Sequence, residues 1–385
     1  MTLAPDSSGP LIEEKAMPDA SPSFHWQQHL HTAARSIDDL VERGIIHPDR
    51  LPGLKAVADR FQMLVSDYYL SLIDPDDPSC PIRLQALPDE SEARVGPYDR
   101  PDPIGDKVHG VTPIMVHRYP DRALLMPTLR CPMFCRYCFR KVAINDDAIR
   151  LHRDLGPSLE YLRTHPEIKE VILTGGDPLM LSERKLEELL GKIKGVPSVE
   201  RLRIHSRFPV TLPMRITPEL VLTLAAASPL TLVTHFNHPR EITTEAKQGI
   251  SLLRSAGISV FNQSVLLAGV NDDEAVQERL WRELARIEVH AHYLHHLDLA
   301  PGTAHLRVSM DRGIELSRNL MKRLGGLARP TYVIDIPGGG GKVPVDGHYV
   351  RPGNSVGTWW LESPLSGEVS LWIDPAVHPD GLNTH

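Results

Sequence analysis

The sequence predicts an α/β fold built around a partial, TIM-like (β/α)6 barrel, with a helical N-terminal arm before it and a small C-terminal segment after it. Two observations predict this class. Six short β-rich runs begin at residue 123, and each is followed by a run with helical spacing. Repeated strand–helix units require right-handed crossovers, which give a parallel sheet with its helices outside. Six units are too few for a complete eight-stranded barrel, in which chemistry lies at the carboxyl ends of the strands.

The N-terminal region is expected to be an arm rather than part of the barrel. Residues 1–22 are rich in Pro, Ser, Asp and Ala and lack the basic start and apolar core of a signal peptide, so they predict a disordered tail. From Phe24 to about Ser71 the apolar residues recur with helical spacing. The Pro- and Asp-rich stretch 74–103 should break regular structure and act as a linker. Residues 23–110 are therefore assigned to a helical arm and linker.

The barrel is assigned to residues 111–330. Start signals for its helices are Ser182, the pair Thr217-Pro218 and Thr244. The expected strands are 123–128, 170–174, 201–205, 231–236, 259–265 and 290–297, and the expected helices 183–190, 219–226, 245–255, 272–287 and 311–324. Residues 331–385 have strand-like runs broken by Pro and Gly, which predicts a separate C-terminal segment.

Composition narrows the class of function. The chain has 385 residues, 41% hydrophobic and 24% charged, and no run approaches the ~18 apolar residues of a membrane span. A net charge of −7 without a basic stripe gives no reason to expect nucleic-acid binding. Only four cysteines, three of them clustered, argue against a disulfide framework. We therefore expect a cytoplasmic protein that acts on small molecules, with no membrane or nucleic-acid partner.

Three cysteines, Cys131, Cys135 and Cys138, follow the first barrel strand in the spacing Cys-x3-Cys-x2-Cys. Thiolates favour zinc, copper(I) and iron–sulfur clusters. Three ligands on a four-iron cluster leave one iron open for chemistry, whereas electron carriers usually have four. The alternative is a closed zinc site completed by Cys80 or a histidine. The spacing resembles the signature of radical S-adenosylmethionine (SAM) enzymes.

Two glycine-rich segments stand out, the first at the end of the second barrel strand and the other in the C-terminal segment. Gly175-Gly176-Asp177-Pro178 would let a ligand approach the backbone closely, although a simple turn is the alternative. In the second, 337–342, four glycines precede Lys342. A phosphate-binding Walker loop is excluded because it needs Gly in place of Ile336 and Ser or Thr in place of Val343. A lysine on a pliable loop suits an amine that forms and releases an imine, as pyridoxal phosphate requires, and a solvated surface lysine is the alternative.

Two arginines just before the first barrel strand, Arg118 and Arg122, are candidates to bind a phosphate, because guanidinium groups match its geometry. Surface ion pairs are the alternative. The histidines at 290, 292, 295 and 296 do not share one strand face and are weak candidates for a metal site.

Together these motifs resemble the lysine 2,3-aminomutase family of radical SAM enzymes, which also carry pyridoxal phosphate. The likeness covers about residues 68–345. It implies that the three cysteines hold a 4Fe-4S cluster whose open iron SAM chelates, that Lys342 forms the imine and that Arg140 binds the substrate carboxylate. It further implies cofactor-binding roles for Arg118, Arg122, Gly175, Gly176, Asp177 and Gln263.

The resemblance also implies a substrate. Asp298 and Asp335 match two aspartates that clamp the distal ammonium of lysine, and two carboxylates repel each other unless a cation lies between them. Glutamate would be repelled, so we expect L-lysine to become β-lysine (3,6-diaminohexanoate). Ornithine, arginine or a lysine on elongation factor P are alternatives, as 135–140 and 203–207 look closer to the subfamily that modifies that factor. A non-catalytic alternative is an iron–sulfur or zinc-stabilised binding protein. The resemblance also implies a reductase, flavodoxin or ferredoxin as electron donor and a homo-oligomer.

Overall fold

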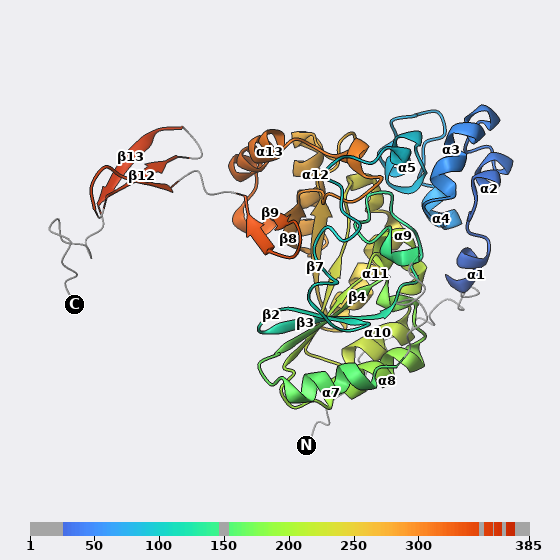
Figure 1. Cartoon of the computed structure of the whole chain (residues 1–385), viewed down its shortest axis with the longest axis horizontal. Helices are drawn as coiled ribbons and strands as arrows, with labels where there is room; N and C mark the ends of the chain where they lie inside the picture. The colour runs from blue at the N-terminus through green and yellow to red at the C-terminus, as the bar shows by residue number, and fades with distance from the viewer. Residues whose placement is uncertain (1–25, 146–153, 346–349, 357, 364–366, 374–385) are drawn as a thin grey trace, which may run out of the picture.

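The structure is a computed structural model that describes residues 26–145, 154–345, 350–356, 358–363 and 367–373. The expected tail over 1–22 lies outside the described residues. A ten-stranded sheet follows chain order from β1 to β10, and its central strands β3 to β9 all pair in parallel (Figure 1). These strands are β3 (Arg122–Thr128), β4 (Glu170–Gly175), β5 (Arg201–His205), β6 (Leu230–Thr234), β7 (Ser259–Val265), β8 (His290–His295) and β9 (Thr331–Ile336). The expected partial barrel is confirmed.

The barrel sheet extends beyond the six expected units at both edges. At one edge, β9 pairs in parallel with β8, and β10 (Gly341–Pro344) pairs antiparallel with β9. The expected boundary at residue 330 therefore falls within the sheet. At the other edge lie the antiparallel strands β1 (Gly110–Thr112) and β2 (Met115–Tyr119). Strand β6 ends two residues earlier than expected, because the backbone N–H of Phe236 donates to the Asn262 side chain instead.

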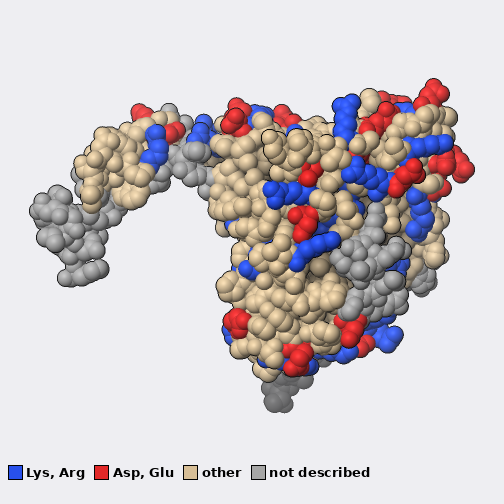
Figure 2. Space-filling model, in the orientation of Figure 1, with Lys and Arg blue, Asp and Glu red and all other residues tan. Residues whose placement is uncertain are grey.

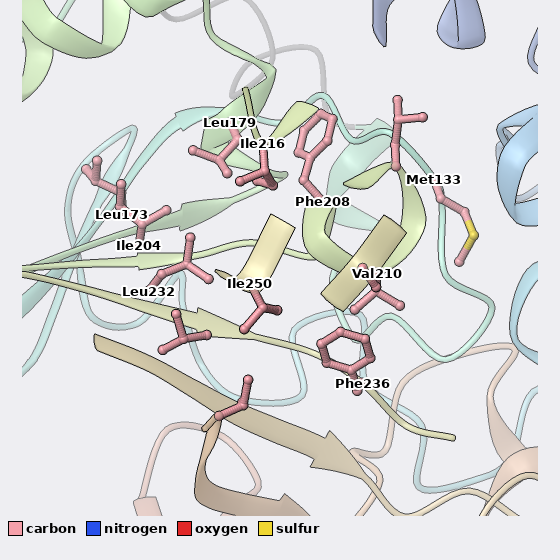
Figure 3. Packing of buried hydrophobic residues seen from close by; sticks show 14 of the residues in the cluster. Met133, Leu173, Leu179, Ile204, Phe208, Val210, Ile216, Leu232, Phe236 and Ile250 are labelled. Atoms are coloured by element: carbon pink, nitrogen blue, oxygen red, sulfur yellow. The ribbon is translucent and has the colours of Figure 1, made fainter. Parts of the chain in front are cut away.

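Amphipathic helices connect successive strands and bury their apolar faces against the sheet. Thr217, Thr243 and Ser309 cap three of them through side-chain hydrogen bonds to the first turn. Figure 3 shows apolar side chains of strands and helices, such as Leu173, Ile204 and Ile250, in one core. Each such buried side chain contributes roughly 1.5–3 kcal/mol. The helices are α7 (Gly156–Thr164), α8 (Glu183–Lys194), α9 (Phe208–Thr211), α10 (Pro218–Ala225), α11 (Thr244–Ser255), α12 (Glu274–Arg286) and α13 (Met310–Arg323).

The N-terminal arm is helical, as its spacing predicts. The expectation that 74–103 lacks regular structure is wrong in part, because Pro81 opens a helix at its first position and a 3-10 turn, η2 (Glu90–Ala93), follows. The arm packs on the barrel, where Trp26 meets Phe208 edge-on with ring centroids 5.6 Å apart. Its helices are α1 (Trp26–His31), α2 (Ile37–Glu42), α3 (Leu51–Ala58), α4 (Asp67–Leu70) and α5 (Pro81–Ala86).

A second, three-stranded antiparallel sheet follows the barrel and consists of β11 (Val350–Pro352), β12 (Thr358–Glu362) and β13 (Val369–Ile373). Its strands extend away from the barrel past α13 (Figure 1), while Glu362, Ser363 and Gly367 at its near end line a surface pocket together with residues of α13. Acidic and basic side chains are interspersed on the face shown in Figure 2. Within the described ranges, no helix has the length and apolarity needed to cross a membrane.

The two edges of the barrel sheet meet through side chains instead of a strand ladder. The backbone N–H of Lys342 on β10 donates to the Tyr119 hydroxyl on β2 at 2.8 Å, and His109 Nε2 lies 3.1 Å from the carbonyl oxygen of Gly339. The loop Pro337–Gly340 packs so tightly on the preceding linker that a Cβ at Gly105 would lie 2.7 Å from its backbone. The loop that precedes Lys342 therefore packs against the segment before β1, through Gly105 and His109.

Candidate active site

The cysteine segment leaves the carboxyl end of β3, where the barrel rule places chemistry. Burial and the neighbouring charges of Asp177 and the other two cysteines raise the pKa of Cys131, so the three thiols lie within electrostatic range of one another. No three His, Cys, Asp or Glu side chains of the described ranges converge on a single metal ion. In a 4Fe-4S cluster each of these cysteines would bind a different iron.

A buried cluster of charged side chains anchors the cysteine segment to the N-terminal arm. Arg136 donates from Nε to Glu92 Oε1 at 2.8 Å, and Lys141 Nζ reaches Glu92 Oε2 at 2.5 Å. All three side chains are almost completely buried. Burial lowers the pKa of Lys141 to about 8, although Glu92 opposes the shift. Glu92 lies in the stretch that the sequence assigned to a linker, and its contact with Arg136 crosses 44 residues.

A second buried network reaches the middle cysteine. Arg207, just after β5, donates from Nη1 to Cys135 Sγ at 2.9 Å and from Nη2 to Glu241 at 2.7 Å. The same nitrogen also lies 2.7 Å from the Gln85 side-chain oxygen of the N-terminal arm. Sequence reasoning missed Arg207 as a site residue. Its position directly after a barrel strand was the available signal.

The Gly175–Asp177 turn packs against the start of the cysteine segment. A Cβ at Gly176 would lie 2.5 Å from the backbone of Leu129 and Arg130, and Gly175 has φ +101°. The close approach that these glycines allow is therefore to the protein's own chain. The Asp177 carboxylate accepts hydrogen bonds from the Leu179 and Arg207 N–H groups and from the Ser206 hydroxyl, and burial raises its pKa to about 6.

Lys342 lies opposite Asp335 in the β9–β10 pair, and its Nζ forms an ion pair with that carboxylate. The same Nζ lies 3.2 Å from His295 Nδ1 on β8. Burial alone would raise the pKa of Asp335, but contacts with His295 and Lys342 outweigh it and lower the pKa to about 2. Burial and the Asp335 charge raise the pKa of Asp298 to about 7, against the lowering effect of Lys342 and Arg140. Two interacting carboxyls are thus driven apart in pKa.

The three arginines named from the sequence differ in their surroundings. Arg140 donates to Asp106 Oδ2 at 3.0 Å from Nε, while Arg118 Nη2 lies 3.4 Å from Asp106 Oδ1. Arg118 Nε is buried without a partner in the described chain, which leaves a donor for a phosphate. Arg122 is more exposed, pairs with Asp121 and stacks 3.9 Å over the Tyr119 ring, so it reaches Lys342 through Tyr119. Asp106, missed by sequence reasoning, links Arg118 and Arg140.

Histidines from several strand ends line the same interior. His205, His235 and His295 each have a buried Nε2 without a partner in the described part of the chain. Gln263, on β7, lies 3.5 Å from His205 Nδ1. The electrostatic coupling of His205 to His295 and Arg140 indicates that they face one interior. Buried polar atoms without protein partners are typical of a ligand site.

The chain is similar in sequence to known proteins. A model of the radical SAM superfamily matches residues 125–280. L-lysine 2,3-aminomutase of Acetoanaerobium sticklandii is 40% identical over 84% of this chain and 79% of its own length. Glutamate 2,3-aminomutase of Clostridioides difficile is 36% identical over 85% and 77%, respectively. L-lysine 2,3-aminomutase of Escherichia coli is 33% identical over 83% and 94%.

The chain belongs to the lysine 2,3-aminomutase family. As a family member it is a radical SAM aminomutase, an isomerase. Membership implies a 4Fe-4S cluster and SAM, and the Cys131, Cys135 and Cys138 motif fits that cluster. Because the relatives are named for lysine and for glutamate, family membership leaves open which amino acid is rearranged.

Proposed function

We propose that this aminomutase converts L-lysine to β-lysine, with pyridoxal phosphate bound to Lys342. The proposal rests on two neighbouring carboxyls, Asp298 and Asp335, which both interact with the charge of Lys342. Two carboxylates repel each other unless a cation lies between them. When Lys342 is occupied by the cofactor, the distal ammonium of the substrate can take its place between them. A substrate carboxylate would instead add a third like charge, which disfavours glutamate.

Each remaining residue receives a role that its surroundings support. When bound, the cluster and SAM supply a radical that removes hydrogen, and pyridoxal phosphate supplies an aldehyde that binds amines covalently. Arg140, on the segment of the cysteines, would bind the substrate carboxylate in place of Asp106. Arg118 would bind the cofactor phosphate through its Nε, which has no partner in the described part of the chain. Asp335 keeps the Lys342 amine in place by its ion pair.

The rest of the proposed site excludes water and positions SAM. Gly175, Gly176 and Asp177 would fix the cysteine segment beside SAM, because the turn is packed against Leu129–Arg130. Gln263 faces the same interior beside His205. Arg122 would act on the cofactor only through Tyr119, on which it stacks.

Product identity tests the substrate. The protein is reconstituted anaerobically with iron, sulfide and pyridoxal phosphate, then incubated with SAM, dithionite and, separately, lysine, ornithine, arginine and glutamate. We expect β-lysine as the main product. Rearrangement of glutamate with lysine inert would contradict the carboxyl-pair argument. Turnover only of a lysine on elongation factor P would favour the protein-modifying alternative, and absence of SAM cleavage would favour a binding protein.

Borohydride reduction tests the role of Lys342. It should fix the cofactor on Lys342, as a mass increase on the peptide that contains this residue. Lys342→Ala should lose the label and roughly a thousandfold or more of the activity. The matched control is Lys322→Ala on the outer helix α13, which should keep both. Labelling that persists in the Lys342 variant would place the cofactor on another amine.

A further inference from the structure

His295 has a hydrogen-bonding requirement that the described protein does not meet. It ends β8 inside the barrel, where its Nε2 is buried and has no partner among the described residues. Its other ring nitrogen, Nδ1, lies 3.2 Å from Lys342 Nζ. What Nε2 requires depends on which of the two nitrogens carries the proton.

The neighbours of His295 decide its tautomer. Lys342 Nζ is paired with the Asp335 carboxylate, and in such a pair the lysine nitrogen donates and does not accept. Nδ1 must then accept from Lys342. The alternative, donation from Nδ1 to Asp335 Oδ2, would span 3.7 Å, which is too long for a hydrogen bond.

The single ring proton therefore lies on Nε2. Burial, with the nearby Lys342 charge, lowers the pKa of His295 to about 4, so the ring is neutral at physiological pH. Nε2–H is then a buried donor without an acceptor in the described protein. Such a donor requires an acceptor from outside the described protein, and a ligand bound beside Lys342 can supply one.

A second histidine shows the same arrangement. His205, at the end of β5, has Nδ1 3.5 Å from the amide nitrogen of Gln263, which can only donate, and its Nε2 is likewise buried without a described partner. His205 and His295 interact electrostatically with each other, and His205 also with Arg140. Donors on two separate strands thus face the interior that holds Lys342.

We propose that His295 is a ligand-binding residue that donates its Nε2–H to an anionic oxygen of the molecule bound at Lys342, while its Nδ1 accepts from the cation paired with Asp335, which is the Lys342 amine before the cofactor binds and the distal ammonium of the substrate afterwards. This inference rests on the proposed function. Two sources offer such an oxygen, the carboxylate of the amino acid and the oxygens of pyridoxal phosphate. Either would be shielded from water, where a hydrogen bond to a charged oxygen is strong.

Three substitutions separate the two ring nitrogens. His295→Asn places a side-chain oxygen near the position of Nδ1 and removes the Nε2 donor. His295→Gln places an amide N–H near the position of Nε2 and removes the Nδ1 acceptor. His295→Phe keeps the ring shape and removes both. In the full-chain, cluster-loaded protein, pyridoxal phosphate binding is followed by visible absorbance, and L-lysine binding by the change in that absorbance without SAM, so that no turnover occurs.

We expect the Asn and Phe variants to weaken one of the two ligands by about tenfold or more, and the Gln variant to remain within about threefold of wild type. Weaker pyridoxal phosphate binding identifies a cofactor oxygen as the acceptor. Weaker lysine binding alone identifies the carboxylate, and L-lysinamide should then bind the wild type and the Asn variant equally. Any other order of the three variants, including equal loss in all of them with a lowered unfolding temperature, overturns the proposal.

Borohydride labelling of the wild-type protein distinguishes a failure of this inference from a failure of the proposed function. If borohydride fails to label Lys342 in the wild type, the proposed function fails. If Lys342 is labelled and the His295 variants bind both ligands like the wild type, only the role of His295 fails.

Discussion

The two sides of the barrel interior differ in how their polar groups are satisfied. On the cysteine side, Glu92 pairs with Arg136 and Lys141, and Arg207 donates to Cys135, Gln85 and Glu241. On the lysine side, two carboxyls have opposite pKa shifts and several histidine nitrogens have no partner in the described chain. The cysteine segment is thus held mostly by contacts within the protein, although the buried Tyr137 hydroxyl also lacks a partner in the described chain, whereas the lysine side depends more on its ligands.

The largest effect should come from a substitution on the cysteine side, at Glu92. Glu92→Gln removes the charge that compensates two buried cations, Arg136 and Lys141, and an unpaired buried charge costs about 3–5 kcal/mol. We expect a lower free energy of unfolding and poor retention of iron after gel filtration, measured by denaturant titration and metal analysis. Glu90→Gln, on the same 3-10 turn but exposed, is the matched control and should change neither. Equal stability of the two variants would show that the ion cluster does not hold the segment.

A smaller effect should follow from the backbone contact at Gly176. Gly176→Ala introduces a Cβ 2.5 Å from the backbone of Leu129 and Arg130, which cannot move aside as a side chain does, and such overpacking costs typically about 1–3 kcal/mol. The thermal unfolding midpoint should fall, and the spectrum of the reconstituted cluster should change because the cysteine segment shifts. Gly191→Ala is the control, since nothing lies within 4 Å of its Cβ and it sits within α8, where alanine stabilises a helix. A midpoint that falls as much in the control would remove the contact as the cause.

Sequence reasoning succeeded where the signal is local and failed where it is tertiary. Periodicity predicted six strands of the barrel and the helices that follow five of them, but not α7, and the cysteine spacing and glycine loop stand out without any neighbours. Strand β9 was missed as a barrel strand because its run is followed by Pro337 and glycines, which read as a break. Asp106, Glu92 and Arg207 were missed because their partners are distant in sequence: Arg207 meets Cys135 across 72 residues and Gln85 across 122. His295 drew attention only as a weak metal ligand, since its relation to Lys342 depends on the β8–β9–β10 order.

The smallest expected effect is on the lysine side and concerns the protonation of Asp298. Burial and the charges of Asp335 and Asp106 raise its pKa to about 7, against the lowering effect of Lys342 and Arg140. A cation between the two carboxyls stabilises the ionised form, so the pKa of Asp298 falls when lysine binds. Below about pH 7 binding must therefore expel a proton, and lysine affinity should weaken by up to about tenfold per pH unit as the pH decreases.

Above about pH 7, Asp298 is already ionised and this dependence should disappear. Asp335, with its pKa lowered to about 2, and His292 and His295, with theirs lowered to about 4, do not titrate in this window. The measurement is the dissociation constant of lysine between about pH 5.5 and pH 8 in the absence of SAM, for wild type and Asp298→Asn. The variant should bind lysine more weakly but with a flat profile below pH 7. If the slope persists in Asp298→Asn, the proton belongs to another group, and the cation would then be held by Asp335 alone.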